Sequence, residues 1–201
     1  AMHILPALAG SATLVFVCLI AKEFGGKLFA VILSMLGFLI APVWLIVDSY
    51  FSYDAFDQLV LAIFLYVLVR FIRSGIRKLW ILMGGIAGIA CLTKMTLLYV
   101  GPGFLVALLL SKYRKHLLTP WPWLGAALFL IILSPYLLWQ VANHWPTLKY
   151  WINYGTIRLY RASVPEYAVE IFYAMNPALF PVYAIGLWRI FRRLGETNYG
   201  F

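Results

Sequence analysis

The sequence predicts an all-α protein, a polytopic bundle of about seven membrane-spanning helices that forms a single domain over residues 1–201. Three observations predict this class: 64% of the residues are hydrophobic, only 11% are charged, and long apolar segments alternate with short polar loops. Soluble domains have an apolar share of roughly 45 to 50%, so the composition excludes an ordinary soluble protein. The net charge of +9 is accounted for by basic loops on one side of a membrane, which leaves little reason to expect nucleic-acid binding.

The first three apolar segments each have about the length that crosses a hydrocarbon layer of roughly 30 Å at 1.5 Å per residue. Gly25 and Gly26 follow the first segment and are typical of a helix end. The second segment contains no charged residue over 20 positions and leads into an acidic stretch, DSYFSYDAFDQ, which begins at Asp48. The predicted spans are 4–21, 28–47 and 55–72.

The segment 79–110 carries a single charge, Lys94, and is too long for one crossing. We expect a tight hairpin of two helices with Lys94 near its tip. Because about 15 helical residues reach only about 22 Å, the tip should lie below the membrane surface, inside a protein cavity. Pro102, between two glycines, should break or kink the second arm. Gly84, Gly85 and Gly88 form a small-residue face that is typical of helix packing.

Two further spans are expected at 123–142 and 176–191. The segment between them, 143–175, is rich in Trp and Tyr and is predicted to be extramembrane or interfacial. The loops then indicate the orientation, because four of them carry 12 of the 16 Lys and Arg residues, whereas five of the seven acidic residues lie in the alternate loops. The positive-inside rule places the basic loops in the cytoplasm; they are 22–27, 70–78, 112–116 and 189–193.

This orientation places the acidic stretch and Lys94 together on the outer face. Seven spans with a cytoplasmic C-terminus also put residue 1 outside, so we expect an upstream span and a first outer loop that this sequence lacks. Asp54 and Asp57 share a helix face at i and i+3, and the residues leave two interpretations open. The carboxylates bind a cation or a hydroxyl, or they stabilise a helix N-terminus, where Ser52 and Asp54 are good caps.

Lys94 is the sharper candidate, since a lysine near the membrane interior costs about 3 kcal/mol and therefore needs a partner. The functional interpretation is a pocket cation for a phosphate or carboxylate, and the alternative is a side chain that reaches the outer interface. Arg158 and Arg161 are candidates for binding an anionic group, with lipid headgroups as the alternative partner. His144, just outside a predicted span, is a further candidate, although a lone His there is more often an interfacial residue.

Two motifs, Phe51-Ser52-x-Asp54-Ala55 and Leu92-Thr93-Lys94-x-Thr96, lie within a longer pattern that includes HILPALAG and GGIAGIACLTKMTLLYVGPG. In this order they resemble the bacterial membrane glycosyltransferases related to dolichyl-phosphate-mannose protein mannosyltransferases and to the aminoarabinose transferases of lipid A. The resemblance covers nearly the whole chain. It implies the C-type glycosyltransferase fold, and transfer of a sugar from a polyprenyl-phosphate carrier to a lipid, glycan or protein acceptor on the outer face of the membrane.

The resemblance also implies roles for particular residues. Asp54 matches an acidic motif of the family and is an accessory site residue, whereas the main catalytic base is expected in the outer loop upstream of residue 1. Lys94 matches a lysine near the donor phosphate. Asp57, His144, Arg158 and Arg161 are further substrate-binding candidates. No metal ligands are predicted, and one acidic stretch without a second ligand cluster leaves the use of a divalent cation open. The implied location is the bacterial inner membrane, with a periplasmic or extracellular active face.

The sequence departs from the family after position 134. Where the family commonly shows Pro-Asn, this chain has Pro135-Tyr136, and His144 is adjacent to Trp145 instead of two positions before it. A catalytic role for His144 is therefore not carried over. Two hypotheses from other classes stay open: a transporter or lipid-translocating module in which Asp54 and Lys94 form a polar pathway, and a catalytically inactive interaction subunit.

Overall fold

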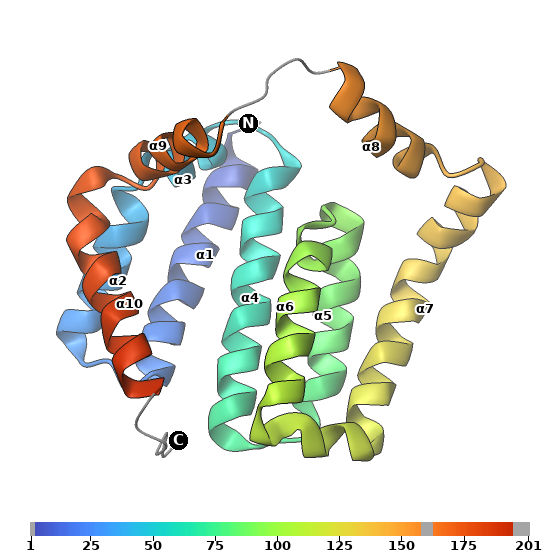
Figure 1. The fold of residues 1–201 in the computed structure, drawn as a ribbon, viewed down its shortest axis with the longest axis horizontal. Helices are drawn as coiled ribbons and strands as arrows, with labels where there is room; N and C mark the ends of the chain where they lie inside the picture. Colours follow the sequence, from blue (N-terminus) through green and yellow to red (C-terminus); the bar gives the residue numbers. More distant parts are fainter. Residues whose placement is uncertain (1–2, 158–162, 195–201) are drawn as a thin grey trace.

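The structure, a computed structural model, describes residues 3–157 and 163–194, and all the regular elements in these ranges are helices. The long helices stand side by side, and α8 and α9 lie across one end of them (Figure 1). The elements are α1 (Ile4–Glu23), α2 (Leu28–Leu39), α3 (Pro42–Ser49), α4 (Tyr53–Ser74), α5 (Leu79–Thr93), α6 (Thr96–Leu110), η1 (Lys112–Leu118), α7 (Pro120–Ala142), α8 (Pro146–Ile157), α9 (Val164–Ala174), η2 (Pro177–Leu179) and α10 (Phe180–Leu194).

The helices confirm an all-α membrane bundle. Three of them, α1, α4 and α7, are long and apolar enough to cross a membrane, and the described residues hold up to six spans if each sharply bent helix pair counts as one. Seven spans were predicted from the sequence, and the segment that these six do not include is α5. This helix is apolar but has only 15 residues. The chain is therefore an integral membrane protein whose hairpin of α5 and α6 has short arms.

The second predicted span is not one straight helix. It is divided into α2 and α3, which meet at an angle of 61°. Pro42 stands at the start of α3, and Ala41 before it is extended with φ −77° and ψ 115°. Proline lacks the N–H that would continue the helix, and it disfavours helical geometry in the preceding residue. The segment of the predicted span 28–47 is thus apolar enough to cross a membrane but is broken at this proline.

The opposite correction applies to α6, which runs from Thr96 to Leu110 with Pro102 inside it. The break expected there is absent. Gly101 comes before the proline, and because glycine has no Cβ it removes part of the steric conflict that a proline imposes on its predecessor. The hairpin itself is confirmed, since α5 ends at Thr93 and α6 begins at Thr96.

The core lies among α4, α5 and α6. Its buried side chains are Phe64, Val67, Phe71, Trp80, Met83 and Leu108. α5 also packs closely on α7, because a Cβ at Gly84 would collide with the carbonyl oxygen of Gly125. The small-residue face of α5 is thus a helix-packing surface, as its composition predicts.

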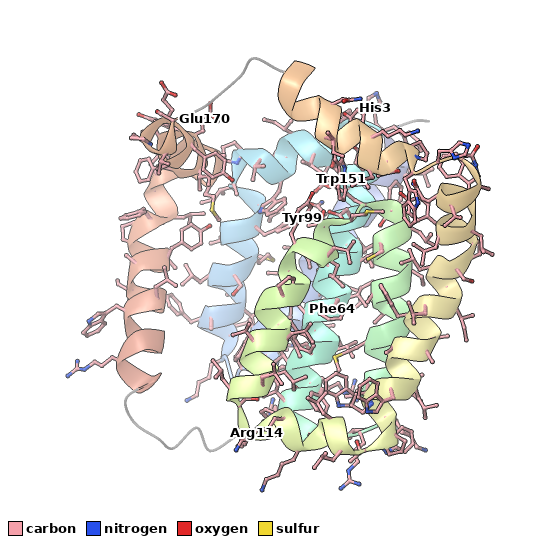
Figure 2. All side chains as sticks on the ribbon, turned by 45° about the vertical axis from the view of Figure 1, so that its right-hand side comes forward. His3, Phe64, Tyr99, Arg114, Trp151 and Glu170 are labelled. Carbon is pink, nitrogen blue, oxygen red and sulfur yellow. The ribbon has the colours of Figure 1, made fainter. Side chains whose placement is uncertain are left out.

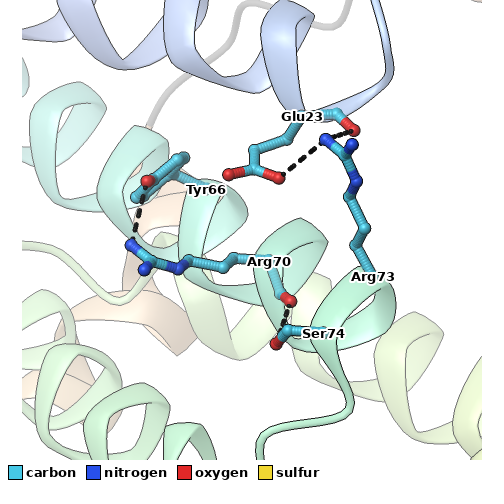
Figure 3. A network of polar contacts seen from close by, with 5 residues as sticks. All are labelled: Glu23, Tyr66, Arg70, Arg73 and Ser74. Carbon is cyan, nitrogen blue, oxygen red and sulfur yellow. Dashed lines mark hydrogen bonds and ion pairs between the residues drawn. The ribbon is translucent and has the colours of Figure 1, made fainter.

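The two ends of the bundle differ in charge. Figure 1 shows the turn before α4, the tip of the α5–α6 hairpin and α8 at one end, and the α1–α2 turn, the α4–α5 loop and η1 at the other. At the basic end, Arg73 Nη1 donates to Glu23 Oε2 at 3.2 Å and to the Glu23 carbonyl oxygen at 2.9 Å, which joins α4 to the end of α1 (Figure 3). Exposed pairs of this kind contribute about 0.2–1 kcal/mol.

Candidate functional site

The candidate site is built on the first turn of α4. Ser52 is the N-cap of this helix, and its hydroxyl accepts from the backbone N–H of Asp54 at 3.2 Å. The same hydroxyl donates to Asp54 Oδ2 at 2.8 Å. A carboxylate in the first turn is also favoured by the helix dipole. The capping interpretation therefore holds for Ser52, and it leaves Asp54 Oδ1 for another partner.

Lys94 is that partner. It follows the last residue of α5 in extended conformation, with φ −155° and ψ 142°, and its Nζ lies 2.7 Å from Asp54 Oδ1. The ammonium also lies 5.5 Å from the centroid of the Tyr53 ring. The two residues that sequence reasoning placed on one face are thus in direct contact across 40 positions of the chain.

The ion pair is open to one side. The Lys94 side chain keeps 45% of its surface exposed and the Asp54 side chain 27%. Lys94 Nζ donates this hydrogen bond to the Asp54 carboxylate, and the contact favours the charged ammonium. An ammonium has three N–H donors, and Asp54 takes one of them. The exposed side of Lys94 can therefore bind an anionic oxygen while the contact with Asp54 is kept.

Asp57 faces a different partner. Its side chain is buried, and its Oδ2 accepts from the hydroxyl of Thr96 at 2.8 Å. Thr96 is the first residue of α6, so this contact ties α4 to the second arm of the hairpin. Sequence reasoning named Asp57 as a substrate-binding candidate and gave Thr96 no role. The signal that points to Thr96 is its place two residues after Lys94 in the second motif.

The third acidic residue of the stretch joins yet another pair of helices. Asp48, near the end of α3, accepts a hydrogen bond from the buried Gln58 of α4. It also packs against α1, since a Cβ at Gly10 would collide with the Asp48 carboxylate. Asp48, Asp54 and Asp57 therefore each have a separate partner, and of the three only Asp54 pairs with a cation within the described residues.

The remaining candidates stand apart from this cluster or outside the described ranges. His144 lies between α7 and α8 with φ 59° and is exposed. Within the described residues, the hydrogen bonds and ion pair of Asp54 and Lys94 do not include it. Arg158 and Arg161 lie outside the described residues. Among the residues that the structure describes, no three His, Cys, Asp or Glu side chains gather as a possible metal site.

An apolar cavity of about 450 Å³ lies among α5, α6 and α7. Cys91 and Leu97 line it close to the hairpin tip, and Phe104 and Phe129 line it farther along the helices. Leu97 follows Thr96 directly, so the cavity begins next to the polar cluster. Its lining suits a hydrocarbon chain, and neither Asp54 nor Lys94 is among the residues that line it.

Comparison with models of known protein families gives one match. The family model described as dolichyl-phosphate-mannose-protein mannosyltransferase matches residues 1–139. The match includes the whole polar cluster and ends before His144. No curated protein and no solved structure matches the chain.

Proposed function

The chain belongs to the dolichyl-phosphate-mannose-protein mannosyltransferase family, and from this premise we propose that it transfers a sugar to a lipid, glycan or protein acceptor on the outer face of the membrane. The family consists of membrane glycosyltransferases that use polyprenyl-phosphate sugars as donors. The observation that carries the proposal for this chain is the half-exposed Lys94–Asp54 pair with a 2.7 Å contact.

The chemistry of the transfer accounts for such a pair. The bond between the sugar carbon and the phosphate oxygen breaks as the acceptor oxygen bonds to the same carbon. The phosphate leaves as an anion, and the acceptor hydroxyl gives its proton to a base. A fixed cation beside the leaving phosphate stabilises the charge that develops there, and it acts more strongly in a low-dielectric site than in water. In our proposal Lys94 is this cation, and Asp54 orients either Lys94 or the acceptor.

The surroundings of the pair support a lipid-linked donor. The apolar cavity among α5, α6 and α7 begins beside the hairpin tip and offers a hydrocarbon environment for the isoprenoid chain of the carrier. The basic loops lie at the end of the bundle opposite the pair. Because basic loops face the cytoplasm, this supports an active site on the outer face. The proposed location is the bacterial inner membrane, with the active face toward the periplasm or the cell exterior.

Substitution of Lys94 by methionine tests the proposal. In membranes supplied with a polyprenyl-phosphate sugar, we expect Lys94→Met to lower transfer by about a hundredfold, the usual effect of removing one stabilising donor from a transition state. Lys149→Met is the matched control, because Lys149 is an exposed lysine of α8 at the same end of the bundle. Transfer by Lys94→Met at the wild-type rate contradicts the proposal.

A further inference from the structure

Two polar contacts join the hairpin tip to one face of α4. Lys94 and Thr96 stand two positions apart at the tip, and their partners Asp54 and Asp57 stand three positions apart on α4, so that they share a helix face. The distances are 2.7 Å for Lys94 Nζ to Asp54 Oδ1 and 2.8 Å for Thr96 Oγ1 to Asp57 Oδ2. One side of the tip therefore docks on a single turn of α4.

The two contacts differ in how firmly they hold. Lys94 has a long flexible stem, and nearly half of its side chain is exposed. Asp57 is 9% exposed, and Thr96 is a β-branched residue with a restricted side chain that belongs to the first turn of α6. A hydrogen bond to a buried carboxylate is stronger than one between neutral groups. The Thr96–Asp57 contact is thus the rigid one, and it acts on the backbone of the tip.

Within the described residues, the neighbouring tip residues Thr93 and Met95 form no side-chain hydrogen bond with α4. Thr93, on the other side of Lys94, donates to the carbonyl oxygen of Ala90 within its own helix at 2.8 Å, and Met95 has no hydrogen-bonding hydroxyl or amide in its side chain. Without Thr96, the ion pair of Lys94 itself would be the polar side-chain contact left between the tip and α4 among the described residues. An anion that competes with Asp54 for Lys94 would then loosen the segment that presents the lysine.

We propose that Thr96 and Asp57 form a clamp that fixes the hairpin tip on α4 and so positions Lys94 for the phosphate of the donor. Asp57 is then a positioning residue and not a substrate contact. The clamp stands on geometry alone, whereas its purpose rests on the proposed function of Lys94. With the clamp closed, Lys94 can exchange one oxygen partner for another while its backbone stays in place.

The first test measures the reactivity of Lys94 and needs no enzymatic activity. The full chain in lipid nanodiscs is treated with an amine-reactive ester, and the acylation rate of Lys94 is followed by mass spectrometry. We expect Thr96→Val to raise this rate about threefold to tenfold, the effect of losing one hydrogen bond. Thr96→Ser should restore the wild-type rate, and Thr93→Val is the matched control that should leave it unchanged. Thr96→Ala serves as a second variant if valine disturbs folding.

The second test measures the affinity of the same variants for polyprenyl phosphate without a sugar. We expect weaker binding by a similar factor in Thr96→Val, with recovery in Thr96→Ser. An unchanged acylation rate in both Thr96→Val and Thr96→Ala overturns the clamp. Faster acylation with unchanged affinity keeps the clamp but overturns the assignment of Lys94 to the phosphate, which is the proposed function.

Discussion

Gln140 is a buried amide that sets the direction in which the chain leaves α7. Its Nε2 donates to the hydroxyl of Tyr136 at 2.6 Å and to Thr147 Oγ1, while the backbone N–H of Thr147 donates to its Oε1 at 3.3 Å. The link between the helices passes through His144 and Trp145, whose φ values are 59° and 58°. Left-handed conformations are unfavourable for such residues, so these bonds hold a turn that would otherwise relax.

Gln140→Leu should release this turn. The Thr147 N–H and the Tyr136 hydroxyl would lose their amide partner, and we expect the free energy of unfolding to fall by about 2 kcal/mol. The amides of α8, residues 146–157, should exchange hydrogen faster. Unfolding in mixed micelles and hydrogen–deuterium exchange measure the two effects. The control is Asn143→Ala, which removes an exposed side chain that donates a hydrogen bond to the Trp139 carbonyl oxygen. Unchanged exchange in α8 contradicts the expectation.

The turn matters for the site because of where it sends α8. Trp151 of α8 lies beside Tyr99 of α6, with ring centroids 6.2 Å apart (Figure 2). Tyr99 stands one turn after Thr96, so α8 contacts the arm that carries the clamp. Gln140 fixes the turn that positions α8, and α8 contacts the arm next to Lys94 through Trp151 and Tyr99.

At the scale of single residues, the sequence allowed the contacts of charged side chains to be predicted but not those of neutral ones. Lys94 and Asp54 could be placed together because a charge in an apolar run needs a partner and because loop charges assign the faces. The contact of Asp57 with Thr96 could not be predicted, since it depends on how α4 and α6 are aligned along each other. The presence of a threonine hydroxyl does not indicate that alignment. The role of Gln140 could not be predicted either, because a single amide near the end of an apolar segment is common and does not indicate a partner.

At the scale of elements, hydropathy located the helices well and their irregularities badly. The predicted span 55–72 became α4, Tyr53–Ser74, and the predicted hairpin became α5 and α6. The break at Pro42 was not predicted, whereas α6 continues without a break through Pro102, where a break or kink was expected. The effect of a proline depends on its position in the helix and on the residue before it. Ala41 allows the extended conformation that ends a helix, and Gly101 leaves room for the helix to continue.

The crossing of α5 and α7 gives a prediction for a single methyl group. Gly84→Ala places a Cβ against the carbonyl oxygen of Gly125, so the two helices must move apart, and we expect the free energy of unfolding to fall by about 1–3 kcal/mol. Gly103→Ala is the control, because a Cβ there meets nothing within 4 Å and should stabilise α6 by up to about 1 kcal/mol. Both are measured by unfolding in mixed micelles. Equal stability of the two variants would show that the crossing is not tight.

At the scale of the whole molecule, the two ends of the bundle carry opposite chemistry. The first turn of α4, which bears Asp54, and α8 share one end, and the last turn of α4, which bears Arg73, and η1 share the other (Figure 1). Because cytoplasmic loops are rich in Lys and Arg, the end with the Lys94–Asp54 pair should face outward. This arrangement followed from the sequence through the alternation of loop charges.

Thiol labelling of intact cells checks the orientation. In a background with Cys18→Ala and Cys91→Ala, we expect Asn143→Cys to react with a membrane-impermeant maleimide from outside. Ser74→Cys, at the opposite end, should react only after the membrane is permeabilised. Both positions are exposed, so access to the reagent is set by the side of the membrane. The reverse pattern would place the candidate site in the cytoplasm and contradict the proposed direction of transfer.

The short arms of the α5–α6 hairpin also affect the lipid around them. Each arm has 15 residues and spans about 22 Å, less than a hydrocarbon layer of roughly 30 Å. A bilayer accommodates such hydrophobic mismatch by thinning beside the short helices. The thinned region would bring lipid headgroups down toward Lys94, so that a carrier could present its phosphate to the ion pair without leaving the leaflet. The shape of the bilayer is then part of the route by which a donor reaches this site.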